Sequence, residues 1–159
     1  MLNLIGVHEC KMDAKGRLAI PRGLKRQLQP FLAEGFVLKR SVFQPCLELY
    51  PMQEWEKVMG KVNKLNRFVK KNNDFIRMFT AGLKLVELDG NGRINVPKDL
   101  MQYAELQGEL TLAAAANLIE VWDKQRYEAS IDVSDDDFGQ LAEEVMGSFN
   151  DDDDDDAIS

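Results

Sequence analysis

The sequence predicts an α+β fold, a small barrel of two related β-hairpin units covered with helices. Residues 13–24 recur as residues 89–100, with Asp, Gly, Arg, Pro and Leu in register. A second repeated segment follows, in which residues 46–50 resemble residues 118–122. After each turn, apolar and polar residues alternate as in half-buried strands. Each copy is too small to bury a good core alone, so the two copies should form one structure.

Each copy opens with the chemistry of a tight turn. The first has Asp-Ala-Lys-Gly and the second Asp-Gly-Asn-Gly. The Asp side chain of such a turn accepts a bond from a backbone N–H two residues on, and Gly suits the last position. Beyond the first turn, Leu18 and Ile20 point away from Arg17, and the second copy repeats this pattern around Arg93. We therefore expect two hairpins, each with an arginine on its solvent face.

A short helix should follow each hairpin. Pro21 and Pro97 suit a first helical turn because proline lacks the N–H that would be unpaired there. Leu24 and Leu28 then mark one apolar face of the first helix. Further strands are expected at residues 36–39, 46–50, 110–112 and 118–122.

A longer helix should join the copies from Gln53 onward. Its apolar residues share one face, Asn72 and Asn73 should interrupt it, and Gly82 is a candidate C-cap. Its basic residues lie mostly on other faces, as in a solvated helix, although contact with a polyanion stays open. These residues are Lys57, Lys61, Lys64, Arg67, Lys70 and Lys71.

Length and composition indicate one domain with a tail. We expect a duplicated domain over residues 1–130, with repeat one at about 4–52, linking helices at 53–82 and repeat two at 83–130. The sequence has no apolar run that could span a membrane and no signal peptide. Two cysteines, Cys10 and Cys46, fit a reducing cytosol better than a disulfide scaffold.

The net charge of −7 hides an uneven distribution. Residues 131–159 hold twelve acids and no Lys or Arg, which leaves residues 1–130 with 20 basic and 15 acidic residues and a net charge of +5. A basic body with an acidic tail is typical of a polyanion binder. Basic residues are concentrated in the first hairpin and its helix: Lys11, Lys15, Arg17, Arg22, Lys25 and Arg26. We therefore expect the first copy to provide most of a phosphate-contacting face.

The acidic tail divides into two parts. Ser134 begins a capping-box pattern, and a stripe at helical spacing predicts a short docked amphipathic helix containing Phe138, Leu141, Val145 and Phe149. Residues 151–156 are six consecutive Asp residues and should be disordered. They are either a solubilising end or a competitor of nucleic acid for the basic face.

The duplicated D-x-x-G-R-h-x-h-P motif (h, hydrophobic), followed each time by h-E-h-aromatic, resembles the MraZ family of bacterial transcriptional regulators. The segment Tyr-Pro-Met-Gln-Glu-Trp after the first repeat is also similar to that family. The resemblance implies an AbrB-like, double-split (swapped-hairpin) β-barrel with both repeats in one protomer. It further implies a cytoplasmic, nucleoid-associated protein that forms a homo-oligomeric ring. Such a ring would bind short direct repeats of DNA in the promoter of the cell-division and cell-wall operon.

The candidate DNA-binding residues follow from the motif and its charge. Arg17 and Arg93 project from hairpin tips, where a planar guanidinium can bind guanine or a phosphate through two bonds. Asp13 and Asp89 can hold these guanidinium groups by a charge-assisted bond; the alternative is that they only form the turns and that the arginines are ordinary solvated charges. With the repeat and the resemblance, we expect a function for the arginines and a mainly structural role for Asp13 and Asp89. The phosphate contacts, which position the protein without specifying sequence, should be Lys15, Arg22, Lys25 and Arg26.

These assignments carry two expectations for variants. The substitution Arg17→Ala should lose more specific binding than Arg93→Ala, because the sequence neighbours of Arg17 are more basic. The substitution Lys25→Ala should weaken binding to all sequences and lower the salt slope by about 1.

Two other classes of function are alternatives to DNA binding. An enzyme is disfavoured, because the single histidine, His8, forms no metal or triad spacing with Cys10 and no nucleotide-binding loop is present. We therefore expect no catalytic residue, cofactor, metal or small-molecule substrate. An antitoxin-like or other protein-binding module stays open, since the acidic tail is studded with Phe.

Overall fold

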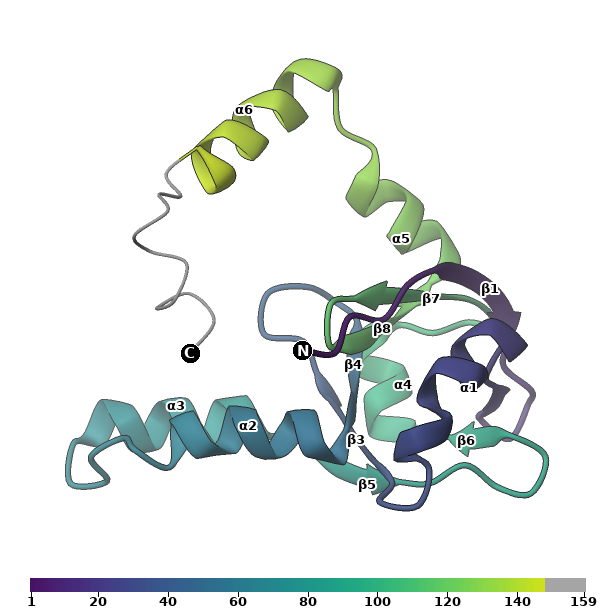
Figure 1. Cartoon of the computed structure of the whole chain (residues 1–159), viewed down its shortest axis with the longest axis horizontal. Coiled ribbons are helices and arrows are strands. Elements are labelled where there is room, and N and C mark those ends of the chain that lie inside the picture. The colour runs from purple at the N-terminus through teal and green to yellow at the C-terminus, as the bar shows by residue number, and fades with distance from the viewer. Residues whose placement is uncertain (148–159) are drawn as a thin grey trace. The chain divides into compact units, whose positions relative to one another are not determined.

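The computed structural model, which describes residues 1–147, confirms the α+β class (Figure 1). A first compact unit spans Met1–Tyr127, and a second begins at Glu128. The strands are β1 Val7–Lys11, β2 Arg17–Ala19, β3 Phe36–Arg40, β4 Leu47–Pro51, β5 Lys84–Val86, β6 Arg93–Asn95, β7 Glu109–Ala115 and β8 Leu118–Asp123. The helices are α1 Arg22–Leu28, η1 Gln29–Phe31, α2 Met52–Val62, α3 Lys70–Thr80, α4 Lys98–Ala104, α5 Lys124–Ile131 and α6 Asp135–Met146.

The two repeats are interlocked rather than side by side. Six strands form one sheet in the order β1-β7-β8-β4-β3-β5, and β2 pairs with β6 in a separate ladder. The first strand of each repeat therefore lies against the third strand of the other, as β1 pairs with β7 and β5 with β3. Exchanging the repeats leaves this order unchanged, so the strands follow an internal twofold relationship.

The expected barrel is not closed by hydrogen bonds in the described part of the chain. The short strands β2 and β6 leave the six-stranded sheet, and β1 is linked to β2 by an isolated bridge between Met12 and Leu18 and by the bond from the Asp13 N–H to the Arg17 carbonyl at 2.9 Å. Each short strand stops before a proline, Pro21 or Pro97, that precedes a helix. Proline has no N–H to continue a ladder, so the second strand of each predicted hairpin ends after three residues.

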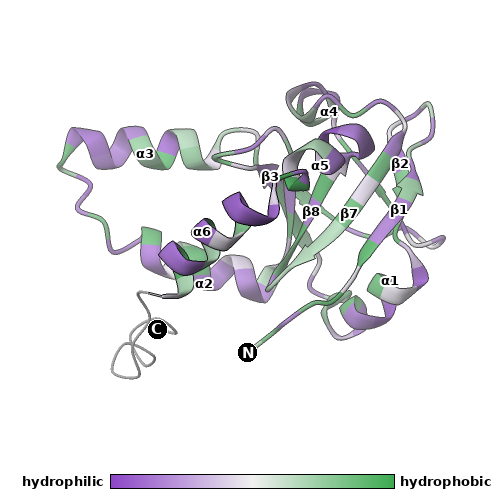
Figure 2. Ribbon diagram, turned by 90° about the horizontal axis from the view of Figure 1, so that it is seen from above, coloured by the Kyte–Doolittle hydropathy of each residue, from purple (hydrophilic) through white to green (hydrophobic). Residues whose placement is uncertain are grey.

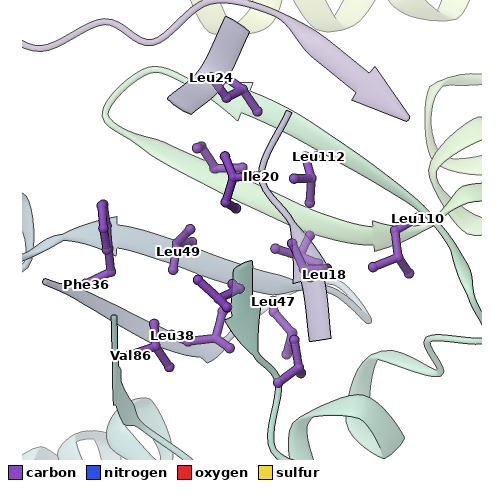
Figure 3. Close-up of a cluster of buried hydrophobic side chains, with 14 of the residues drawn as sticks. Leu18, Ile20, Leu24, Phe36, Leu38, Leu47, Leu49, Val86, Leu110 and Leu112 are labelled. Carbon is purple, nitrogen blue, oxygen red and sulfur yellow. The ribbon is translucent and has the colours of Figure 1, made fainter. Parts of the chain in front are cut away.

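The main core lies between one face of the six-stranded sheet and the layer formed by β2, β6, α1 and α4. Apolar residues of both repeats meet there, as Figure 3 shows for Leu18, Leu38, Leu47 and Leu110. Leu24 and Leu28 of α1 are fully buried in it, as their helical spacing predicts. The core thus joins the two copies into one unit.

The helices α2 and α3 pack on the other face of the sheet. Trp55 lies edge-on to Tyr50 and stacks on Phe79, which ties both helices to β4. From this contact the two helices project away from the tip of β6 (Figure 1), and hydrophilic and hydrophobic stretches alternate along them (Figure 2).

The break between α2 and α3 differs from the prediction. It falls at residues 63–69, and Asn72 and Asn73 lie inside α3. The Asn66 side chain accepts a bond from the Phe68 N–H at 2.9 Å, which makes a turn that competes with the helix. Asn72 and Asn73 then donate to the carbonyls of Asn66 and Arg67, at 3.0 and 2.6 Å. Their side chains therefore hold the connecting loop.

Within the second unit, α6 begins after Ser134, whose hydroxyl accepts a bond from the Asp137 N–H at 3.1 Å. Phe138 and Leu141 of this helix are exposed, and none of its residues is buried. The predictions for Phe149 and for the Asp run at 151–156 lie outside the described residues. None of the helices described is long and apolar enough to cross a membrane.

Candidate nucleic-acid interface

The first turn is held by a single carboxylate. Asp13 Oδ1 accepts bonds from the backbone N–H groups of Lys15 and Arg17, both at 2.9 Å. Its Oδ2 accepts a bond from Arg17 Nε at 2.8 Å. The Gly16 N–H donates to the Asp13 carbonyl at 3.0 Å and closes the turn. Asp13 therefore forms the turn and also fixes the guanidinium beside it. We call residues 13–17 the first tip.

The second turn repeats this geometry, and we call residues 89–93 the second tip. Asp89 Oδ1 accepts from the N–H groups of Asn91 and Arg93, at 2.8 and 3.0 Å, and Oδ2 accepts from Arg93 Nε at 3.0 Å. Gly92 closes the turn with a φ of 73°, a conformation that suits glycine. The duplicated sequence therefore gives a duplicated constellation.

Each arginine is bound through Nε only, among the interactions of the described residues. The terminal nitrogens Nη1 and Nη2 stay available to a ligand, and the side chains of Arg17 and Arg93 are 34% and 30% exposed. A guanidinium fixed at one nitrogen offers its remaining edge with little loss of conformational freedom. That edge matches guanine O6 and N7 or two phosphate oxygens.

The same contacts lower the pKa of both carboxyl groups. The backbone N–H of Arg17 is the main cause for Asp13, with the Arg17 side chain adding to it against some desolvation, so the pKa falls below its ordinary value of 3.8. For Asp89 the backbone N–H of Arg93 plays the corresponding part. Both groups are thus ionised at neutral pH, which keeps the charge-assisted bonds to the arginines intact.

The ladder of β2 and β6 places both arginines on one surface. Leu18 lies opposite Ile94 and both are buried, so the alternate residues face outward. Arg17 pairs with Asn95, two residues along from Arg93. The two arginines are therefore diagonal neighbours, with about 7–8 Å between their Cα atoms by strand geometry.

The other predicted contacts divide between the tips. Lys15 is exposed within the first tip, and Arg22 and Arg26 are exposed on α1. Lys25, also on α1, is half-buried and lies over Gly92 of the second tip: a Cβ atom added at Gly92 would lie 2.9 Å from Lys25 Nζ. The structure thus brings Lys25 to the second repeat's turn.

The repeat offset of 76 points to two further positions that are not among the expected contacts. Met101 corresponds to Lys25 and lies over Gly16, with its Cε 3.1 Å from where a Cβ would be. Lys98 corresponds to Arg22 and is exposed at the start of α4.

The basic helices α2 and α3 lie away from the second tip (Figure 1), and some of their charges are paired, as in the bonds from Lys57 to Glu54 and from Lys70 to Asp74.

Comparison with known proteins decides the family. The model of the family described as "MraZ protein, putative antitoxin-like" matches twice, at residues 4–78 and 79–149. The chain belongs to the MraZ family.

Relatives within the MraZ family cover nearly the whole chain. The Transcriptional regulator MraZ of Christiangramia forsetii is 60% identical over 93% of this chain and 96% of its own length. That of Flavobacterium psychrophilum is 60% identical over 96% of this chain and 97% of its own length. The Cytophaga hutchinsonii protein is 37% identical over 89% and 93%. The resemblance seen in the motifs is therefore confirmed.

Membership in a family of transcriptional regulators also answers the question of catalysis. This family is not an enzyme family, as expected. In the part of the chain that the structure describes, no group of three His, Cys, Asp or Glu residues is arranged to hold a metal ion. Cys10 and Cys46 are both free thiols.

Proposed function

We propose that this MraZ family protein regulates transcription by binding DNA sequence-specifically through its two tips. The observation that carries the proposal is the repeated carboxylate-locked arginine, with free terminal nitrogens at Arg17 and Arg93. In this role the arginines bind guanine or a phosphate, while Asp13 and Asp89 fix the positions of their guanidinium groups. Lys15, Arg22, Lys25 and Arg26 contact phosphates and set the position of the protein on the duplex.

The spacing of the tips supports this role. Diagonal neighbours in an antiparallel ladder are about 7–8 Å apart, and successive nucleotides of one DNA strand rise about 3.4 Å. Arg17 and Arg93 can therefore reach positions about two base steps apart on one duplex. The ladder that carries them has only two strands, and its outward face bears Ala19 and Asn95, which are small or polar and exposed.

The finer parts of the proposal concern architecture, target and assembly. We propose that the interlocked repeats are an AbrB-like double-split barrel, with repeats at about 4–52 and 83–130 joined by the helices at 53–82. The promoter of the cell-division and cell-wall operon would be the target, bound at short direct repeats by a cytoplasmic, nucleoid-associated ring of protomers. Exposed apolar side chains on or near α2 and α3 support contact between protomers, since Phe68, Met78 and Leu85 are 100%, 76% and 78% exposed.

A ring would raise affinity without any new contact at the tips. One pair of tips binds weakly, whereas several pairs on tandem sites act through effective concentration. Light scattering coupled to gel filtration gives the number of protomers. A monomer at micromolar concentration would remove the ring from the proposal but leave DNA binding by a single protomer open.

DNA binding is tested by fluorescence anisotropy with a duplex from upstream of this protein's own gene. A shuffled duplex of equal composition is the control, and both are measured at two salt concentrations. We expect tighter binding to the natural duplex, affinity that falls steeply with salt, and loss of specificity in the double variant Arg17→Ala/Arg93→Ala. Equal binding of both duplexes by wild type and double variant would overturn the proposal.

An antitoxin-like, protein-binding role is the second candidate, because the matching family description contains that term. The exposed apolar residues of α6, among them Phe138 and Leu141, would suit a protein partner. Affinity capture with the full chain, compared with Phe138→Ser/Leu141→Ser, discriminates the two functions. A stoichiometric protein partner that depends on these residues, together with no DNA shift, would favour the module.

A further inference from the structure

The side chain of Lys25 crosses from the first repeat to the second. Lys25 belongs to α1, which follows the first hairpin, yet its Nζ lies against Gly92 in the turn of the second hairpin. A Cβ atom built on Gly92 would lie 2.9 Å from Nζ, 3.3 Å from Cε and 3.5 Å from Cδ. Three atoms of one side chain thus cover this glycine.

The interlocking of the strands explains the crossing. The Ile20 N–H donates to the Gly92 carbonyl at 3.0 Å, so the chain that leaves β2 starts α1 beside the second tip. The reciprocal bond runs from the Val96 N–H to the Gly16 carbonyl at 2.8 Å, and α4 therefore starts beside the first tip. Each tip is covered by the helix of the other repeat.

The two helices place different chemistry at equivalent positions. Over Gly92 lies the ammonium-bearing chain of Lys25, and over Gly16 lies the thioether of Met101, with its Sδ 3.3 Å from a Cβ built there. In the turns themselves the lysine is in the first tip: Lys15 stands there, and the equivalent residue of the second tip is the uncharged Asn91. Each tip therefore has one Arg and one Lys, supplied by different elements.

The Lys25 ammonium has no carboxylate partner among the described residues. It lies against Gly92, the residue that directly precedes Arg93 in the second tip, and the Arg93 guanidinium is bound at Nε with no other bond among the described residues. An ammonium at the same turn as a fixed guanidinium suits the oxygens of a DNA phosphate.

We propose that Lys25 is the phosphate-binding lysine of the second tip, so that a residue of repeat one completes the DNA contact of repeat two. This inference rests on the proposed DNA-binding function. The expectation from sequence counted Lys25 among the charges beside Arg17. With Lys25 at the second tip, we instead expect Arg17→Ala and Arg93→Ala to lose affinity to a similar extent.

A double-mutant cycle tests the assignment, because residues that bind one group are coupled and distant ones are additive. The variants are Lys25→Met, Arg93→Ala, Arg17→Ala and the two doubles that contain Lys25→Met. Binding is measured by anisotropy with the upstream duplex and its shuffled control. Methionine is chosen because Met101 occupies the equivalent place, so the packing over the turn is kept.

We expect Lys25→Met to weaken binding to both duplexes by about tenfold at low salt and to lower the salt slope by about 1. In the Arg93→Ala background its effect should shrink to below about twofold, while in the Arg17→Ala background it should persist. Equal effects in both backgrounds, or stronger coupling to Arg17, would overturn the inference.

Two further measurements keep the outcomes separate. Adding Met101→Lys to Lys25→Met places an ammonium over the first tip, and we expect it to restore affinity and to couple to Arg17 instead of Arg93. Thermal unfolding of each variant shows whether the fold is intact. If the arginine variants lose affinity for DNA and Lys25→Met does not, only this inference fails. If the arginine variants keep the affinity of the wild type, the proposed function fails as well.

Discussion

Glu48 of the first repeat lies directly opposite Glu120 of the second in the pairing of β4 with β8. The two occupy equivalent positions, but their partners differ. Glu48 accepts a bond from the buried Lys39 Nζ at 3.3 Å, whereas Glu120 accepts one from Trp122 Nε1 at 3.1 Å. Among the described residues, one carboxylate of the facing pair therefore has a cationic partner and the other does not.

This difference predicts opposite effects on stability. Like charges directly opposite each other destabilise a sheet, so Glu120→Gln should raise the free energy of unfolding by about 0.5 kcal/mol. Its amide oxygen can still accept the Trp122 bond. Urea unfolding followed by tryptophan fluorescence provides the measurement.

Glu48→Gln is the matched control at the equivalent position. It leaves the fully buried Lys39 ammonium without a carboxylate, so stability should fall by about 1–3 kcal/mol. Equal changes of the same sign in the two variants would contradict the assigned partners.

The paired residues Leu18 and Ile94 should contribute strongly to stability. They face each other in the β2–β6 ladder and are 0% and 1% exposed, within the core that both repeats share. We expect Leu18→Ala and Ile94→Ala each to lower the free energy of unfolding by about 2–5 kcal/mol. Single cooperative transitions in chemical denaturation are expected, because the core is continuous across the repeats. Separate transitions for the two repeats would count against a shared core.

The turn glycines should differ in their tolerance of alanine. Both have positive φ, so each substitution costs backbone strain of about 1 kcal/mol or more. At Gly16 the new Cβ would also lie 3.0 Å from the Val96 carbonyl oxygen, whereas at Gly92 the atoms nearest to it would belong to the flexible end of the Lys25 side chain. Thermal unfolding should therefore show a larger loss for Gly16→Ala than for Gly92→Ala, and the reverse order would disprove this reading of the two turns.

The carboxylates of the tips set a pH dependence. The pKa values of Asp13 and Asp89 are lowered in the folded chain, chiefly by the backbone N–H groups of Arg17 and Arg93. Their stabilising contribution is therefore present above the unfolded value of 3.8 and is lost as the pH falls through the lower folded values. Carboxyl carbon NMR titration should place both midpoints below 3.8. A midpoint above that value at either residue would show that the turn bonds do not persist in solution.

Local rules were sufficient to predict much of the fold and the candidate site. Alternation placed Leu18 and Ile20 inside and Arg17 outside, and the turn chemistry of Asp13 placed its carboxylate beside the arginine. Each of these predictions depends on residues that lie within a few positions of one another in the sequence. The break at residues 63–69 was missed because it depends on Asn side chains that bond to a loop six residues away.

The separation of β2 from the large sheet and the position of Lys25 were beyond such rules. Both depend on the pairing of β2 with β6, strands that lie far apart in the chain. Sequence neighbours assigned Lys25 to the first tip, whereas the pairing carries it to Gly92. Periodicity cannot tell which copy a strand will pair with.

Reciprocal pairing of the repeats has a consequence for how such a protein can diverge. In a homodimer of a single-copy ancestor, symmetry would impose the same residue at both equivalent places. Fusion into one chain lifts that restriction, and the chain now carries Lys15 with Met101 at one site and Asn91 with Lys25 at the other. The lysine of one half therefore lies in the turn, and that of the other half lies on the helix. A single polypeptide can in this way evolve two chemically different sites from one duplicated unit.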